Sequence, residues 1–346
     1  MCLIEACCHG AVPGLTRRLL LAVLATLAPA VAASPAGAAG HHQTLAATKP
    51  SPNAGIVDIY TTLGFENGLA AGTGMVLSRT GEILTNNHVI NGATAFKVVD
   101  VTTRKKYNAT VVGYSVSHDV AVLQLVHASG LRTIKLGRTT KVRVGQQVIA
   151  RGNAQGRGGA PKVAQGRIIA LHRQIVAKDG SGNSETLTNV IATNAPVEPG
   201  DSGGPLQDAL GRTIGMVTAG STSGPHRGFA ITIKHALAYA KAIMKGKSSA
   251  TIHVGPTAFL GVVLQDTSAK SGAEITDIVT GGAADSAGLV AGDVITSLNG
   301  ASISSSADIR KEVLALTPGT SVAIGWTDSS SVVHTGTITP ASGPPQ

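Results

Sequence analysis

The stretch Gly200-Asp201-Ser202-Gly203-Gly204-Pro205 contains a serine flanked by glycines, and the apolar Leu206 follows the stretch. Its composition suits a plain turn, because Gly, Asp, Ser and Pro are the usual turn residues. It also suits a nucleophile, because glycines let the backbone expose its N–H groups and let a substrate chain approach closely. The length and order of the motif favour catalysis, with Ser202 as the nucleophile.

A serine hydroxyl needs an imidazole to accept its proton and a carboxylate to orient that imidazole. Taken alone, His88 could be a structural histidine and Asp119 a turn residue. However, His88 follows the hydrophobic run 82–85, and Asp119 stands directly before the apolar run 120–126. His118 is a competing base, but it adjoins Asp119, and consecutive strand residues point to opposite faces. We therefore predict that His88 and Asp119 act with Ser202.

Short β-type runs bounded by Gly, Asn, Asp or Ser surround these residues. Many short strands without long helices between them predict β-barrels or sandwiches, so the fold class should be mostly β. The runs lie at 55–60, 74–77, 82–85, 96–99, 109–112, 120–126, 147–150, 163–170, 190–193, 213–219 and 228–233. A helix with a period near 3.6 is expected at 234–245. We assign residues 55–245 to one β-rich domain.

A second, smaller domain is expected at 257–341, after a linker at 246–256. This domain should contain both strands and helices. Its strands are expected at 259–264, 273–279, 293–298 and 321–326, and its helix at 306–316, after a serine-rich start and before Pro318-Gly319.

The N-terminal segment reads as an export signal. Arg17-Arg18 precede an apolar run at 19–27, and Ala30-Val31-Ala32 forms a cleavage pattern. The alternative is an uncleaved membrane anchor, but the apolar stretch is shorter than the ~20 residues that a bilayer span needs. We predict a signal peptide at 1–32, a flexible lead-in at 33–54 and a secreted or envelope-associated protein.

Cofactors, metals and nucleic acid are not expected. All three cysteines precede residue 9, so the remaining chain holds no disulfide framework and no thiolate zinc site. The net charge of +9 could attract nucleic acid, but the densest basic run is only 104–106 and no aromatic residues interleave it. The glycine-rich stretch 152–159 lacks the Lys-Ser/Thr ending of a phosphate-binding loop.

The chain resembles the HtrA/DegP-like branch of the trypsin-type serine proteases, above all its small secreted actinobacterial PepA-type form. The resemblance rests on Thr85-Asn86-Asn87-His88-Val89, His118-Asp119-Val120-Ala121-Val122-Leu123 and the hexapeptide at 200–205, and spans about 55 to 340. It implies a trypsin-like double β-barrel, with His88 as general base, Asp119 as its partner and Ser202 as nucleophile. The N–H groups of Gly200 and Ser202 would form the oxyanion hole.

The resemblance also implies binding sites for substrate. The S1 pocket would be lined by Thr218, Ala219, Gly220, Phe229 and Ala230. Pro196 stands where trypsin carries an acid, so a small or medium apolar P1 residue is expected. Residues 257–341 resemble a PDZ domain, in which Leu260, Gly261 and Val262 would bind a peptide C-terminus as an added strand.

Partners implied by the resemblance are unfolded or misfolded polypeptides, with a homotrimer as the possible assembly; contact with a membrane is expected only if the N-terminal segment stays uncleaved. The alternative function is an envelope chaperone with minor proteolysis. One residue departs from the pattern: Asp201 stands where many relatives have Asn, and we expect it to be a solvated or hydrogen-bonded turn residue.

Overall fold

The computed structural model describes residues 51–65, 68–138, 141–178, 184–220, 227–267 and 271–346. The expected signal peptide, the cysteines and most of the lead-in lie outside these ranges. Strands dominate the described chain, in agreement with the mostly β class expected from the sequence. No helix in these ranges is long and apolar enough to cross a membrane.

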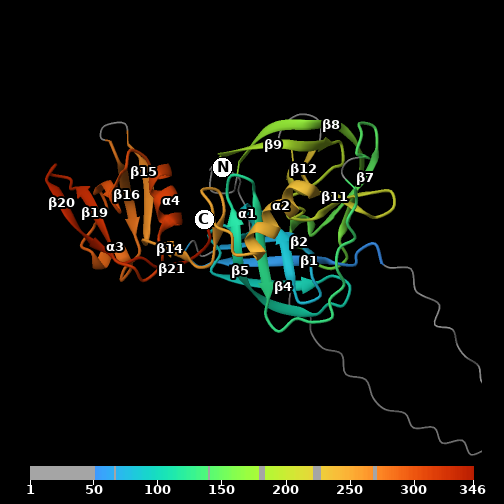
Figure 1. The fold of residues 1–346 in the computed structure, drawn as a ribbon, viewed down its shortest axis with the longest axis horizontal. Coiled ribbons are helices and arrows are strands. Elements are labelled where there is room, and N and C mark those ends of the chain that lie inside the picture. Colours follow the sequence, from blue (N-terminus) through green and yellow to red (C-terminus); the bar gives the residue numbers. More distant parts are fainter. Residues whose placement is uncertain (1–50, 66–67, 139–140, 179–183, 221–226, 268–270) are drawn as a thin grey trace, which may run out of the picture. The chain divides into compact units, whose positions relative to one another are not determined.

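The first half of the β-rich domain forms a sheet that closes on itself (Figure 1, blue to green), and β13 from the segment expected as a linker pairs with its strand β5. Its strand order is β13-β5-β4-β1-β2-β3-β6, and an additional pairing of β5 with β6 closes the circle. The strands are β1 (Ile56–Leu63), β2 (Gly68–Val76), β3 (Glu82–Thr85), β4 (Ala95–Asp100), β5 (Lys106–Ser115), β6 (Val120–Leu125) and β13 (His253–Val254).

The second half forms a closed barrel of order β10-β11-β12-β9-β8-β7 (Figure 1, green to yellow). Its strands are β7 (Gln147–Gly152), β8 (Lys162–Lys178), β9 (Ser184–Thr193), β10 (Pro205–Asp208), β11 (Thr213–Gly220) and β12 (Gly228–Thr232). The short 3₁₀ turn η2 (Ala154–Gly156) follows β7. The sequence pattern missed β10, because this strand has only four residues and begins with a proline.

Helix α2 (Ile233–Met244) packs against both barrels, with contacts to β5, β6, β11 and β12. Its buried residues Ile233, Ala236, Ala240 and Ile243 recur every three or four positions, so they share one helical face. They join apolar residues from both barrels in one core cluster. This shared core fixes the two barrels against each other, which matters because the candidate site draws residues from both.

The C-terminal unit has its own core and a sheet of order β15-β16-β17-β19-β20 (Figure 1, orange to red). The helix α4 (Ser306–Ala315) begins after Ser305, whose side chain caps it by accepting the N–H of Asp308 at 3.3 Å. The remaining elements are β14 (Thr257–Phe259), β15 (Val262–Asp266), β16 (Ala273–Ile278), α3 (Ala283–Ser286), β17 (Val294–Leu298), β18 (Ala301–Ser302), β19 (Val322–Thr327), β20 (Val333–Ile338) and β21 (Ala341–Gly343).

Two differences from the sequence pattern have a local cause. The strand expected at 259–264 is two strands, because Gly261 between them has φ +80°, which breaks the extended backbone. Strand β20 was missed because its residues Val333 to Ile338 do not alternate between apolar and polar side chains, although their burial alternates.

Candidate active site

The candidate catalytic residues come from three elements of the two barrels. His88 lies in the one-turn helix α1 (Asn87–Ile90), which follows β3 directly. The sequence interpretation placed His88 at the end of a strand. In the structure His88 lies instead in this single turn of helix. Asp119 precedes β6, and Ser202 precedes β10 of the second barrel. The site is therefore assembled where the barrels meet, and no single strand or loop contains it.

His88 and Asp119 form a close pair. Nδ1 of His88 lies 3.0 Å from both Oδ1 and Oδ2 of Asp119, and the backbone N–H of His88 donates to Oδ1 at 3.1 Å. The Asp119 carboxylate is 2% exposed, whereas the His88 side chain is 31% exposed. A buried carboxylate thus orients an accessible imidazole, leaving Nε2 as the atom that can accept a proton from a nucleophile.

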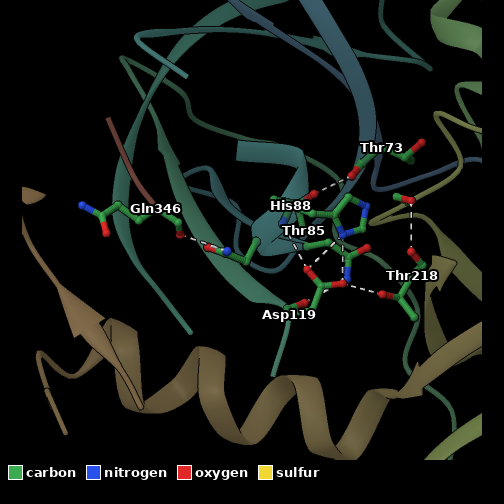
Figure 2. Close-up of polar contacts among 9 residues, drawn as sticks. Thr73, Thr85, His88, Asp119, Thr218 and Gln346 are labelled. Atoms are coloured by element: carbon green, nitrogen blue, oxygen red, sulfur yellow. Dashed lines mark hydrogen bonds and ion pairs between the residues drawn. The ribbon is translucent and has the colours of Figure 1, made fainter. Parts of the chain in front are cut away.

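Thr218 connects the carboxylate to the nucleophile. Its hydroxyl donates to Oδ2 of Asp119, and its carbonyl oxygen accepts the Ser202 hydroxyl at 3.3 Å. Figure 2 shows His88, Asp119 and Thr218 pointing toward one another. The sequence interpretation placed Thr218 in the S1 lining; in the structure its side chain is buried and bonds to Asp119.

The backbone at Asp119 is held in an unusual conformation. Asp119 has φ +49°, in the left-handed region that few residues other than glycine adopt. Its N–H donates to the carbonyl of Val116 at 2.9 Å, and its own carbonyl accepts Nδ2 of Asn86 at 2.9 Å. Asn86, two residues before His88, therefore ties the base and the carboxylate together through the backbone.

The competing histidine, His118, lies in a separate environment. Its ring stacks on Tyr239 of α2 with centroids 4.0 Å apart, and its Nδ1 lies 3.0 Å from Oγ of Ser115. Burial, and then the nearby His235, lower the pKa of His118. The ring packs against the helix, while the Asp119 carboxylate contacts His88.

Two backbone N–H groups are available beside Ser202. Among the described residues, no acceptor takes the N–H of Gly200 or that of Ser202. Gly200 has φ +94°, and a Cβ atom there would lie 2.2 Å from the carbonyl oxygen of Asn153. Only glycine fits this position, because any side chain would collide with that backbone. The arrangement can receive an oxyanion formed at a carbonyl attacked by Ser202.

Asp201, the neighbour of Ser202, is buried, with 2% of its surface exposed. The interpretation as a solvated residue is therefore wrong, while its hydrogen bond is present: Oδ2 accepts the N–H of Glu198 at 2.9 Å. Its Oδ1 has no hydrogen-bond partner among the described residues. Burial raises the pKa of Asp201, against the lowering effect of the Glu198 N–H.

The residues expected in the S1 pocket lie on adjacent strands. Ala219 pairs with Phe229, and Gly220 pairs with Gly228, between β11 and β12. Ala230 pairs with Val217 and is 1% exposed. The sequence interpretation missed Val197.

Val197 lies against both glycines of this region. A Cβ added at Gly228 would lie 3.0 Å from both methyl carbons of Val197, and one added at Gly220 would lie 3.4 Å from Cγ2. The isopropyl group of Val197 therefore lies in contact with this part of β11 and β12.

In the C-terminal unit, two of the residues expected to bind a peptide, Leu260 and Gly261, lie between β14 and β15, and the third, Val262, begins β15. The carbonyls of Leu260 and Gly261 accept the N–H groups of Ala284 and Val279 at 2.9 Å each. Within the described chain no acceptor takes the N–H of Leu260 or Gly261. Among the strands of the described residues, β15 pairs with β16 alone, so its other edge has no strand neighbour there. The described residues contain no group of His, Cys, Asp or Glu that could hold a metal ion.

Comparisons with known proteins identify both domains of the chain. A trypsin-like peptidase domain model matches residues 72–216, and a PDZ domain model matches residues 249–324. The serine protease PepD of Mycobacterium tuberculosis is 32% identical over 336 residues, covering 92% of this chain and 69% of PepD. The periplasmic serine endoprotease DegP of Escherichia coli K12 is 32% identical over 270 residues, covering 74% of this chain and 54% of DegP.

The chain thus spans about half the length of DegP. Among solved structures, the HtrA-type protease AlgW with a tripeptide is 28% identical with a TM-score of 0.49, covering 84% of this chain and 95% of that chain.

Proposed function

The chain belongs to the HtrA/DegP-like family of trypsin-type serine proteases with one PDZ domain, and we propose that it is an exported endopeptidase of unfolded or damaged proteins. The contact that carries the proposal is His88 Nδ1 at 3.0 Å from the buried Asp119 carboxylate, beside the glycine-flanked Ser202. The periplasmic names of several relatives and the apolar N-terminal segment support an extracellular or envelope location.

In the proposed mechanism, Oγ of Ser202 attacks the carbonyl carbon of the scissile bond while Nε2 of His88 takes the hydroxyl proton. The carbonyl electron pair moves to oxygen, where the N–H groups of Gly200 and Ser202 receive it. Collapse of this intermediate expels the amine, which takes the proton from His88 and leaves an acyl-enzyme. Water then repeats the sequence and releases the acid.

Asp119 stabilises the imidazolium formed in each half of this cycle. Its carboxylate is buried and already accepts hydrogen bonds from His88 and Thr218, so the charge does not have to reorganise when the imidazole becomes positive.

Substitution of the nucleophile tests the proposal. Ser202→Ala should abolish casein digestion and labelling by a serine-directed fluorophosphonate, because the attacking oxygen is removed. The matched control is Ser297→Ala in β17, which leaves the nucleophile in place and should digest casein as the wild type does. Normal digestion by Ser202→Ala would refute the assignment. Suppression of client aggregation by the inactive variant would show the chaperone function that is the second candidate.

The P1 preference should follow from Val197. Its methyl groups lie beside Gly220 and Gly228 and narrow the expected S1 region, so small or medium apolar P1 residues should be preferred. Profiling of the peptides cut from an unfolded protein measures this. Val197→Ala should shift the preference toward larger apolar residues about tenfold in kcat/KM, since each methylene in such a pocket is worth about 1–3 kcal/mol. Dominant cuts after Lys or Arg would contradict it.

The PDZ unit should bind peptide C-termini along β15. The unpaired edge of β15 supplies backbone groups for an added strand, and the N–H groups of Leu260 and Gly261 can receive the terminal carboxylate. Binding of fluorescent peptides with a free carboxylate, compared with the same peptides carrying a C-terminal amide, measures this directly. Equal affinity for both forms would contradict carboxylate recognition.

A further inference from the structure

The direction of the Gly200 N–H is set from outside the nucleophile turn. That N–H belongs to the peptide between Pro199 and Gly200, whose carbonyl oxygen accepts the N–H of Gln155 at 2.6 Å. The carbonyl and N–H of a trans peptide point in opposite directions. The bond from Gln155 therefore directs the Gly200 N–H away from the 153–159 loop, and a rotated peptide would lose this bond.

The loop that carries Gln155 needs support of its own. Gln155 has φ 58° and ψ 19°, in the left-handed region that costs a residue with a side chain free energy. Within the loop, Oδ1 of Asn153 accepts the N–H of Gly158 at 2.7 Å. A conformation that is unfavourable locally persists only when surrounding contacts maintain it.

Thr73 of β2 supplies such contacts to both segments with one hydroxyl group. Its Oγ1 accepts the N–H of Asn153 at 2.9 Å and donates to the carbonyl of Gly200 at 2.7 Å. The same oxygen therefore joins the loop that carries Gln155 to the turn that carries Ser202.

The backbone of Thr73 adds two more bonds. Its N–H donates to the carbonyl of Ser202 at 2.8 Å, and its carbonyl accepts the hydroxyl of Thr85 at 2.8 Å. Figure 2 shows Thr73 and Thr85 beside His88. Thr73 is completely buried, so water does not compete for these groups.

We propose that Thr73 is a positioning residue for the oxyanion hole: its hydroxyl fixes the 153–159 loop against the nucleophile turn, so that the Gly200 N–H points at the developing oxyanion. The inference rests on the proposed proteolytic function. It assigns to Thr73 an effect on the transition state, where the oxyanion exists, and little effect on substrate binding.

Thr73→Val tests this, because valine keeps the shape of threonine and removes the hydroxyl. We expect kcat toward a short chromogenic peptide to fall about 10- to 100-fold, below the loss known for removing an oxyanion donor outright, with KM within about twofold. Thr73→Ser, which retains the hydroxyl, should keep kcat within about threefold of the wild type.

Thr213→Val is the matched control. Thr213 is also completely buried, on β11, and its hydroxyl has no hydrogen-bond partner among the described residues. A threonine-to-valine change there alters the same atoms without breaking a bond, so kcat should equal that of the wild type. Equal kcat for Thr73→Val and Thr213→Val would overturn the proposal.

A pair of inhibitors separates positioning from packing. A peptide aldehyde forms a tetrahedral adduct with an oxyanion, whereas the corresponding peptide alcohol has no carbonyl at P1 and binds only as a ground-state ligand. Thr73→Val should weaken binding of the aldehyde about as much as kcat falls, and binding of the alcohol should not change. Equal weakening of both would indicate general distortion and refute positioning.

Two further outcomes are also decisive. If circular dichroism shows that Thr73→Val does not fold, kcat is compared instead between Thr73→Ala, which lacks the hydroxyl, and Thr73→Ser, which keeps it.

A wild-type enzyme that neither cleaves peptides nor reacts with a fluorophosphonate would refute the proteolytic function itself. That result is distinct from failure of the Thr73 assignment.

Discussion

At the scale of single residues, the buried Asp58 of β1 has a consequence for pH dependence. Asp58 is 2% exposed, and burial raises its pKa to about 6, although the Arg104 guanidinium and the Gly159 N–H act to lower it. A Cβ atom added at Gly158 would lie 3.7 Å from Oδ2 of Asp58, so this carboxyl lies beside the 153–159 loop, whose Gln155 directs the Gly200 N–H. Its ionisation in the folded protein is unfavourable compared with the unfolded chain.

Asp58→Asn should therefore change how stability varies with pH. Because the folded pKa lies above the unfolded value of 3.8, the contribution of Asp58 is fully present below about pH 4 and is lost as pH rises through about 6. Asparagine does not ionise in this range. The free energy of unfolding of the variant, relative to that of the wild type, should therefore rise by on the order of 1–3 kcal/mol between pH 4 and pH 7. Urea unfolding across that range measures it, and a difference that stays constant with pH would contradict the prediction.

At the scale of elements, helix α2 joins the two barrels through one apolar face. Ile243 near its C-terminal end is completely buried, and its Cγ2 would lie 2.8 Å from a Cβ atom added at Gly113 of β5. The absence of a side chain at Gly113 is thus what lets the helix lie close to the first barrel. The sequence anticipated this helix to within one residue at each end, because its period is regular over three turns.

Ile243→Ala should destabilise the protein by about 2–5 kcal/mol, because it removes buried methylenes and leaves a cavity between the barrels. Lys241→Ala on the exposed face of the same helix is the control and should change stability by less than about 0.5 kcal/mol. Urea unfolding followed by circular dichroism compares them. Similar losses from both variants would show that the buried face of α2 is not what stabilises the barrels.

At the scale of the whole molecule, the chain has separate cores for the β-rich domain and the C-terminal unit. The buried residues of the C-terminal core belong to none of the barrel clusters. The single tryptophan of the chain, Trp326, is 9% exposed within the C-terminal core and stacks on His334 with centroids 5.3 Å apart. Its fluorescence should therefore report this unit specifically.

Two matched core substitutions test that separation. Ile295→Ala in the C-terminal core should lower the urea midpoint of the Trp326 fluorescence transition, because Ile295 is completely buried in that core. Ile191→Ala in the second barrel should instead lower the urea concentration at which peptide hydrolysis is lost. If each variant shifts both transitions equally, the two units unfold as one cooperative structure and the prediction is wrong.

Much of the candidate site was predictable, because its three principal residues lie in motifs that are continuous in sequence. His88, Asp119 and Ser202 each stand at the boundary of an apolar run, so residue type and spacing were enough to select them. The element at His88 was not predictable: four residues form one turn of helix, too short for a periodic pattern. The burial of Asp201 was also missed, because a Gly-Asp-Ser turn reads as polar and exposed.

The sequence by itself determined most of the strands, the position of α2, the division into two domains and the chemical types needed for a nucleophile, a base and a carboxylate. Those are local properties of short segments, which periodicity and turn chemistry encode. The tertiary structure alone decided that Thr218 donates to Asp119, that Val197 lies against Gly228, and that Thr73 bonds to Gly200. Thr73 and Gly200 are 127 positions apart, and a bond between such residues exists only once two barrels have closed and packed together.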